Sequence, residues 1–200
     1  SIGLLKVMVD KDMPKGSKNV QEIEQGLRYA NDVLNNVLRL SYPKQLLLVD
    51  VDIKDLFEEI EKSQNIKTLL KENQIRLDVK IGPHLPTVKA DGMQLREVVS
   101  VLVTNAAQAM QSGGTLTMKA ELDHTKMVLD VTDTGPGIPA DVLENLFTPY
   151  FTTKHRGLGL GLCISREIVK AHHGTLEVST EVGKGTTFSI RLPIAKGEAR

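Results

Sequence analysis

Two glycine-rich segments in the second half of the chain flank a polar segment. The first, DTGPGIP at 133–139, begins with an aspartate that follows the apolar stretch VLDVT, and the second, GLGLGL at 157–162, leads into a helical pattern. An ionised aspartate only accepts hydrogen bonds, which suits an exocyclic amine such as N6 of adenine. Backbone N–H groups at a helix start, together with the helix dipole, favour a phosphate. The two segments therefore predict a purine nucleotide held at both ends, with NLFTPYFTTKHR at 145–156 between them.

A third polar group, Asn105, lies in the helical sequence REVVSVLVTNAAQAM among aliphatic and small residues. Its amide oxygen is suited to a Mg²⁺ ion that bridges phosphates. Each feature also has a purely structural explanation: a hydrogen-bonded asparagine in a core, an Asp-Thr-Gly turn, and a loop that allows close helix–sheet packing. The glycines lack the Gly-Lys-Ser/Thr spacing of a Walker loop, and no strand directly precedes them as in a dinucleotide-binding fingerprint. The combination of the features carries the nucleotide prediction.

The elements that must position these residues follow from hydrophobic periodicity and from breakers. The predicted strands are 46–53, 75–81, 115–122, 126–133, 175–180 and 186–192, and the predicted helices are 53–72, 92–111, 139–146 and 160–171. Asp52 and Asp91 are predicted to cap the first two of these helices, and Pro83 and Pro86 to lie in a loop. The sum is an α/β (α+β) two-layer sandwich, in which helices cover one face of a mixed, mostly antiparallel sheet.

The N-terminal region has a different pattern. A turn with Pro14 and Gly16 separates residues 2–10, which look like the end of a helix, from a long helix predicted over 20–42. In that helix apolar residues recur at alternating three- and four-residue steps: Val20, Ile23, Leu27, Ala30, Leu34 and Val37. This seam favours a helical hairpin or a coiled-coil dimer. The alternative is an amphipathic helix packed on its own domain.

Composition excludes several classes of protein. Lys plus Arg and Asp plus Glu both number 25, so no basic field points to nucleic acid. The single Cys163 excludes an internal disulfide and fits a reducing compartment. No apolar run approaches the ~20 residues of a membrane span, and no signal peptide is apparent. We predict a cytoplasmic location, either free or as the cytoplasmic part of a membrane-anchored sensor, without membrane contact by this stretch.

Five motifs then follow one another in a recognisable order: NAAQAM, DTGPGIP, LFTPYFTTK, GLGLGL and GKGTTF. In order and spacing the chain resembles the ATP-binding domain of bacterial sensor histidine kinases from about residue 20 to Pro193, and FTPYFTTK is most similar to the nitrogen-regulator type. This fold is shared with gyrase, heat-shock chaperone ATPases and mismatch-repair ATPases. Residues 27–60 resemble the second dimerisation helix and linker of the kinases. The resemblance implies a partial dimerisation domain at 1–45, an ATP-binding domain at 46–195 and a tail at 196–200.

The resemblance also implies a role for each matching residue. Asn105 matches the Mg²⁺-binding asparagine, and Asp133 matches the aspartate that reads adenine, with Gly135 and Gly137 beside the base. Thr186 matches the threonine that supports adenine. The other implied ATP-binding residues belong to a lid, to an aromatic box under it and to the phosphate side: Ile138, Phe147, Phe151, Thr153, Lys154, Gly157, Leu158, Gly159, Leu160, Gly161 and Leu162.

Two departures from the family pattern bear on catalysis. The position four before Asn105 usually carries a polar residue that positions phosphate, metal or water, and here it is Val101. No histidine occurs before His84, so the phosphoacceptor motif of the first dimerisation helix is absent from this chain. The remaining histidines are predicted to be loop and cap residues, among them His124, His172 and His173. The candidates for catalytic roles are Glu97, Lys154 and Arg156.

Three functional hypotheses follow. The first is the ATP-binding catalytic portion of a sensor histidine kinase, an enzyme that uses ATP and Mg²⁺, forms a homodimer and passes the phosphoryl group through a histidine outside this chain to a response regulator. The second is a nucleotide-binding regulatory module without kinase activity, favoured by Val101 and by the missing acceptor. The third is a non-kinase ATPase or a serine kinase of the same fold. The absence of a glutamate at 101 argues against hydrolysis, because no general base is evident.

Overall fold

A computed structural model describes Ile23, Gly26 and residues 46–154 and 157–194 of the chain. The chain divides into two units, residues 1–44 and 45–200, and each is described by itself. In the first unit, Ile23 and Gly26 are helical and exposed, within the helix predicted over 20–42. The remainder of that helix, the turn at 12–18 and the predicted dimerisation surface lie outside the described residues.

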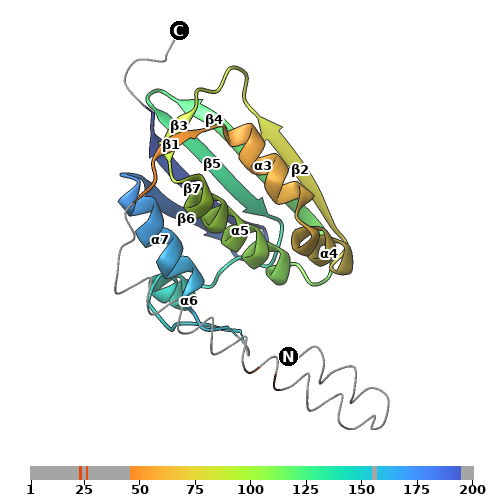
Figure 1. The fold of residues 1–200 in the computed structure, drawn as a ribbon. Coiled ribbons are helices and arrows are strands. Elements are labelled where there is room, and N and C mark those ends of the chain that lie inside the picture. The colour runs from red at the N-terminus through yellow and green to blue at the C-terminus, as the bar shows by residue number, and fades with distance from the viewer. Residues whose placement is uncertain (1–22, 24–25, 27–45, 155–156, 195–200) are drawn as a thin grey trace. The chain divides into compact units, whose positions relative to one another are not determined.

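The second unit is built on a five-stranded sheet with the order β2-β4-β5-β7-β6. Strand β2 (Ile75–Ile81) runs parallel to β4 (Gly114–Asp123), whereas β5 (Lys126–Asp133), β7 (Gly185–Pro193) and β6 (Thr175–Glu181) continue it in antiparallel pairs. The helices lie together on one face of this sheet (Figure 1). The predicted two-layer architecture is confirmed, and the strands that carry the base-side residues lie next to one another in the sheet.

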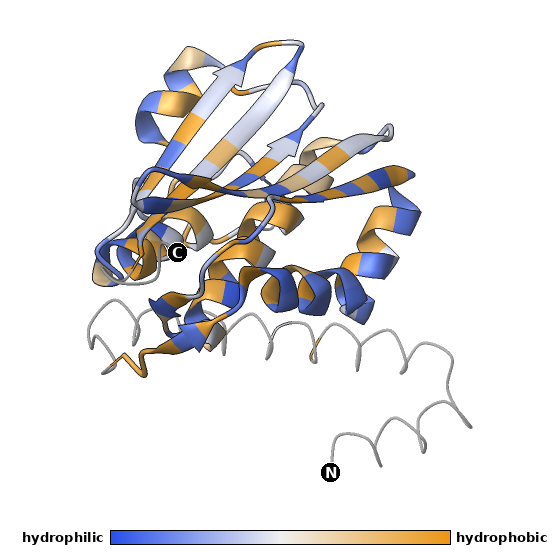
Figure 2. Ribbon diagram, turned by 90° about the horizontal axis from the view of Figure 1, so that it is seen from above, coloured by the Kyte–Doolittle hydropathy of each residue, from blue (hydrophilic) through white to orange (hydrophobic). Residues whose placement is uncertain are grey.

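Alternation along the strands explains why one face takes the helices. In β5 the side chains of Met127, Leu129 and Val131 are almost fully buried, whereas Asp130 and Thr132 are half-buried on the other face. Figure 2 shows the same alternation of hydrophobic and hydrophilic segments along the strands. A strand with this period-two pattern packs one face on a core. Asp133 continues the buried side of the pattern, so its carboxyl group lies on the helix-covered face of the sheet.

The helices are α3 (Ile53–Lys62), α4 (Gln64–Glu72), α5 (Gly92–Ala109), α6 (Ala140–Asn145) and α7 (Gly161–Ala171). Asp52 and Asp91 cap α3 and α5 as predicted, because their side chains accept hydrogen bonds from the N–H groups of Lys54 (2.7 Å) and Gln94 (3.1 Å). Among the helices of the described part, none is long and apolar enough to cross a membrane.

Buried His172 ties the two central helices together. Its Nε2 accepts a hydrogen bond from the Asp91 N–H (2.9 Å), so its Nδ1 donates to the Ile168 carbonyl (2.8 Å). The ring thereby links the C-terminus of α7 to the N-terminus of α5. The histidine is a structural group, as its position at a helix end predicted.

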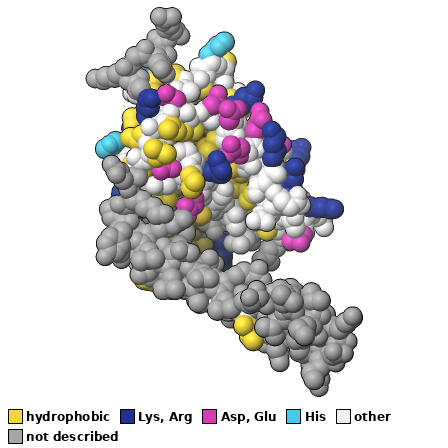
Figure 3. All heavy atoms as spheres, viewed as in Figure 1, with side chains coloured by type: hydrophobic (Ala, Val, Ile, Leu, Met, Phe, Trp, Pro, Cys, Tyr) yellow, Lys and Arg dark blue, Asp and Glu magenta, His cyan; other side chains and the backbone are white. Residues whose placement is uncertain are grey.

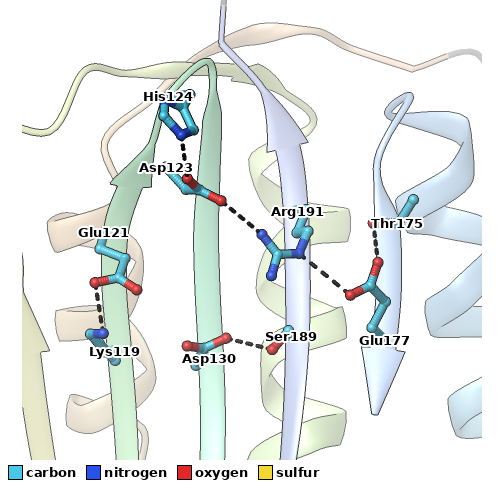
Figure 4. A network of polar contacts seen from close by, with 9 residues as sticks. All are labelled: Lys119, Glu121, Asp123, His124, Asp130, Thr175, Glu177, Ser189 and Arg191. Carbon is cyan, nitrogen blue, oxygen red and sulfur yellow. Dashed lines mark hydrogen bonds and ion pairs between the residues drawn. The ribbon is translucent and has the colours of Figure 1, made fainter. Parts of the chain in front are cut away.

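The outer face of the sheet is polar, and no helix among residues 46–154 and 157–194 covers it (Figure 4). Arg191 donates to Asp123 Oδ2 (3.1 Å) and to Glu177 Oε2 (3.4 Å), and Ser189 donates to Asp130 (2.6 Å) (Figure 4). The opposite side of the molecule shows acidic, basic and hydrophobic side chains interspersed (Figure 3). Exposed pairs of this kind contribute at most about 1 kcal/mol each to stability.

The structure corrects the sequence-based boundaries in three places. The helix predicted over 53–72 is broken at Ser63, whose extended ψ of 125° ends α3 and precedes α4. The strand predicted over 46–53 is limited to β1 (Val49–Val51). The loop after Pro86 contains an unpredicted strand, β3 (Val88–Ala90), which pairs antiparallel with β1. At three residues β3 is too short to show an alternating pattern, so it was missed.

Candidate functional site

The buried carboxyl group of Asp133 forms one end of the site. Asp133 ends β5 with 4% of its surface exposed, and its Oδ1 accepts a hydrogen bond from the Gly135 N–H (2.8 Å). Burial raises the pKa of Asp133 above its ordinary value, and the backbone N–H groups of Gly135 and Thr186 oppose that shift by donating to the carboxylate. The chain therefore holds an acceptor group almost entirely out of water at a strand end.

Thr186 lies beside Asp133 because the two residues are direct partners in the β5–β7 ladder. On the other side, Thr186 pairs with Thr180 of β6. The hydroxyl oxygens of the two threonines are 3.0 Å apart, and Thr186 is buried. Three polar side chains thus stand in a row across three adjacent strands. The sheet register, rather than a loop, sets their spacing.

Gly137 closes the base side with a turn that a side chain would prevent. Its φ is +73°, and a Cβ atom there would collide with the carbonyl oxygen of Glu181 in β6. The next residue, Ile138, donates its N–H to Thr180 Oγ1 (2.9 Å). Gly137 and Ile138 are therefore held against the end of β6, beside the row of polar side chains.

The second end of the site is the half-buried Asn105 on α5. Its Oδ1 accepts a hydrogen bond from Lys154 Nζ (2.7 Å), which also donates to Gln108 Oε1. The Lys154 side chain is exposed as a whole, but partial burial of its ammonium group lowers the pKa of Lys154 below its ordinary value. A lysine from the segment between the glycine motifs therefore places a positive charge on the amide oxygen predicted to bind a metal ion.

The two phenylalanines of that segment differ in their surroundings. Phe147 packs against the hydrophobic core, and the guanidinium carbon of Arg166 on α7 lies 4.9 Å from the centre of its ring. Arg166 also donates to the Phe147 carbonyl (3.5 Å). Phe151 is half-buried and Thr153 is exposed. Arg166 thus attaches the start of the segment to α7.

The phosphate-side glycines precede and begin α7, which starts at Gly161. Gly159 has a φ of +66°, and a Cβ atom there would collide with the Phe151 carbonyl oxygen. The Gly159 carbonyl accepts a hydrogen bond from the Tyr150 N–H (3.1 Å). This segment is exposed at Gly157, half-buried at Leu158 and Leu162, and buried at Leu160. The backbone contact connects the glycine run to the polar segment before it.

Val101 lies between the two motifs that would serve the phosphates. It is half-buried one helical turn before Asn105, and a Cβ atom at Gly161 would lie 3.2 Å from its Cγ1. The valine therefore packs against the start of α7 and contributes no polar atom there. Glu97, half-buried on the same helix, is a further turn from Asn105.

Contacts within the described part of the chain bring Gly135, Gly137, Ile138 and Thr186 together around Asp133, and Lys154 to Asn105. His155 and Arg156 lie outside the described residues. Sequence reasoning missed Thr180, Gln108 and Arg166. The period-two pattern of Leu176, Val178 and Thr180 places Thr180 on the inner face of β6, and Gln108 follows Asn105 at a helical spacing, so both left a signal in the sequence.

Comparison with known proteins identifies the family and the fold. Residues 90–196 match a family model described as histidine kinase-, DNA gyrase B-, and HSP90-like ATPase. The sensor histidine kinase ZraS of Escherichia coli strain K12 is 37% identical over 164 residues, which cover 82% of this chain and 35% of ZraS. The chain thus spans about a third of the length of that curated relative.

Two solved structures resemble the chain. Full-length ShkA in complex with AMPPNP has a TM-score of 0.83 at 25% identity, covering 97% of this chain and 42% of ShkA. The histidine kinase ThkA in complex with the response regulator TrrA has a TM-score of 0.75 at 24% identity, covering 98% of this chain and 57% of the matched chain.

Proposed function

The chain belongs to the histidine kinase-, DNA gyrase B- and HSP90-like ATPase family, and within it to the sensor histidine kinases, and from this premise we propose that residues 46–195 bind Mg-ATP as the catalytic portion of a two-component sensor kinase. The γ-phosphoryl group leaves ATP as ADP is formed, joins a histidine nitrogen outside this chain, and then passes to an aspartate of a response-regulator receiver domain. Homodimerisation through the N-terminal helical segment and a cytoplasmic location belong to the same proposal.

The observation that carries the proposal is the buried Asp133 carboxyl group beside Thr186. Both groups are fixed by the strand ladder before any ligand arrives, and both lie on the helix-covered face. A carboxylate held by two backbone N–H donors retains acceptor capacity for an amine on a planar base. AMPPNP in the similar ShkA structure supports an adenine nucleotide as the ligand.

The phosphate end fits a divalent cation. Among the described residues no group of three acidic, histidine or cysteine side chains could hold a metal by itself. A Mg²⁺ ion bound through phosphate oxygens needs few protein oxygens, and Asn105 Oδ1 already holds a cationic ammonium group, 2.7 Å away. We propose that Asn105 is the protein ligand. The ion, when bound, neutralises phosphate charge.

The residues of this chain would then act by positioning and by charge. Asp133 orients the base, a lid from about Glu144 to Leu158 covers the phosphates, and Lys154 supplies a positive charge close to Asn105. Positioning and electrostatic stabilisation account for most of the catalysis of phosphoryl transfer. The acceptor histidine would come from a dimerisation helix, as the family resemblance implies; His172 of this chain is already occupied on both ring nitrogens.

The second candidate is a regulatory module that binds ATP without transferring its phosphoryl group. Val101 favours it, because its side chain packs against Gly161 where the kinase family carries a polar group. An asparagine there would add an amide within one helical turn of Asn105. If Val101 limits catalysis, the Val101→Asn variant gains transfer activity while its ATP affinity stays close to that of the wild type.

Two measurements test the proposals. Titration with a fluorescent ATP analogue, with and without Mg²⁺, tests binding, and the expected result is saturable binding that unlabelled ATP reverses. Transfer from radioactive ATP to a histidine-containing dimerisation domain tests the kinase. Wild-type transfer as fast as that of Val101→Asn rules out the regulatory module. Steady ATP turnover without any acceptor protein would instead favour the non-kinase ATPase.

A further inference from the structure

The hydroxyl group of Thr180 occupies the third place in the polar row at the base end. Thr180 and Thr186 are direct partners in the β6–β7 ladder, and Thr186 and Asp133 are direct partners in the next. Their side chains therefore share the helix-covered face. None of the sequence motifs that indicate the nucleotide site includes Thr180. Its role is therefore inferred from its hydrogen bonds in the structure.

The hydrogen bonds of Thr180 determine the direction of the next bond in the row. A hydroxyl group has one proton to donate and two lone pairs that accept. Thr180 Oγ1 donates that proton to the Gly185 carbonyl oxygen (3.0 Å), which can only accept, and it accepts from the Ile138 N–H (2.9 Å). The Thr180 hydroxyl group can then form one further hydrogen bond, as an acceptor, through its second lone pair. The hydroxyl of Thr186, 3.0 Å away, must therefore donate to Thr180.

A consequence follows for Thr186. Because its only hydroxyl proton points to Thr180, the Thr186 oxygen presents lone pairs to the rest of its surroundings. Asp133 beside it also presents acceptors. The end of the site thus offers two neighbouring acceptors and no side-chain donor from this pair.

We propose that Thr180 is a positioning residue that fixes Thr186 as a hydrogen-bond acceptor and so makes the site select a 6-aminopurine over a 6-oxopurine. The inference rests on the proposed nucleotide binding. The two protons of an exocyclic amine match the two acceptors, one at Asp133 and one at Thr186, directly or through a water molecule. A 6-oxo group brings an acceptor to the same place, and Thr186 cannot turn its proton toward it while Thr180 holds that proton.

The test compares ATP with inosine triphosphate, which carries a 6-oxo group on an otherwise similar purine. Both nucleotides compete against a fluorescent ATP analogue on the full chain. The wild type is expected to prefer ATP. Thr180→Val releases the Thr186 proton, so the ratio of the two affinities falls about tenfold, mainly because inosine triphosphate binds better. Loss of one directed hydrogen bond is worth about this factor. Thr180→Ser keeps the hydroxyl group and restores the wild-type ratio.

A matched control lies on the opposite face of β7, the strand that carries Thr186. Thr187 and Thr132 form another hydroxyl pair, also 3.0 Å apart, across the β5–β7 ladder. Thr187→Val removes that pair and leaves the affinity ratio unchanged. Thermal unfolding of each variant shows whether the substitution affects stability, so a change in selectivity is separated from a change in folding.

Each outcome supports or overturns a defined statement. A folded Thr180→Val variant with the wild-type ratio overturns the inference. If that variant does not fold, Thr186→Val replaces it: removal of the hydroxyl itself must lower the ratio, and an unchanged ratio overturns the inference. A wild-type chain that binds neither the fluorescent analogue nor ATP contradicts the proposed function instead.

Discussion

The two ends of the candidate site are built in different ways. At the base end, Asp133 and Thr186 are buried, and partners in the strand ladder fix their positions. At the phosphate end, Asn105 is half-buried on a helix and contacts an exposed lysine 49 residues away in sequence. Groups held by a ladder pay little ordering entropy on binding, whereas the Lys154 ammonium group is held only by side-chain hydrogen bonds to Asn105 and Gln108. We therefore expect the proposed base end to be preformed and the proposed phosphate end to be adjustable.

The largest expected effect tests the preformed end. Asp133→Asn replaces a carboxylate that only accepts by an amide that also donates, beside N–H groups that already point at it. We expect the affinity for a fluorescent ATP analogue to fall about 100-fold, since a buried charge-assisted hydrogen bond is lost and a donor faces a donor.

The control for this prediction is Asp130→Asn, the same substitution three residues earlier in β5. Asp130 lies on the outer face and accepts from Ser189 (2.6 Å). Its replacement leaves the affinity unchanged. Unchanged affinity in Asp133→Asn itself means that the adenine assignment is wrong, provided that circular dichroism shows a native fold.

The base end was predictable from sequence because an alternation of apolar and polar residues predicts a strand. The predicted boundaries 75–81 and 126–133 agree with β2 and β5, and the position of Asp133 after an alternating run placed it at a strand end. The role of Thr180 could not be predicted, because it depends on the β6–β7 register and on which atom donates to Gly185. Neither is encoded in a local pattern.

The phosphate end was less predictable. Asn105 stood out as an amide among aliphatic residues, but its contact with Lys154 joins a helix to a distant segment with no periodicity of its own. The break at Ser63 was missed for a similar reason. The apolar spacing continues through 53–72, and only the extended backbone of Ser63 separates α3 from α4.

The second prediction concerns the metal at the adjustable end. Asn105→Ala removes the proposed oxygen ligand and leaves the base contacts in place. We expect the affinity for ATP with Mg²⁺ to fall about tenfold, and the affinity in the presence of a chelator to stay as in the wild type. Titration with the fluorescent analogue under both conditions provides the readout. If the affinity falls equally with Mg²⁺ and with a chelator, Asn105 is not a metal ligand, and it acts instead in folding or in direct contact with phosphate.

A smaller effect is expected at Lys154. Lys154→Gln removes a positive charge from the phosphate end but keeps a side chain able to donate to Asn105 and Gln108. The ammonium group is partly buried, but the Lys154 side chain as a whole is exposed, so solvent screens much of its charge. We expect the affinity for Mg-ATP to fall about two- to fivefold.

Lys170→Gln is the matched control for Lys154. Lys170 is an exposed lysine of α7 paired with Glu167 (2.9 Å). Its replacement should leave the affinity unchanged. A loss at Lys154→Gln as large as that at Asp133→Asn would contradict the division into a preformed and an adjustable end.

The last prediction concerns how burial of the Asp133 carboxyl group changes the free energy of unfolding with pH. Burial raises the pKa of Asp133 above its ordinary value of 3.8, so the folded state favours the protonated group. Protonation of Asp133 stabilises the folded state fully below the unfolded pKa of 3.8. This contribution is lost as the pH rises through the raised pKa of the folded state, because between the two values the unfolded chain binds fewer protons than the folded chain. Asp133→Asn does not titrate. Urea unfolding at pH 4 and pH 7 should therefore show the variant gaining stability relative to the wild type as the pH rises. A pH-independent difference for Asp133→Asn would mean that the carboxyl group is solvated in the free protein, and that the base end forms only around its ligand.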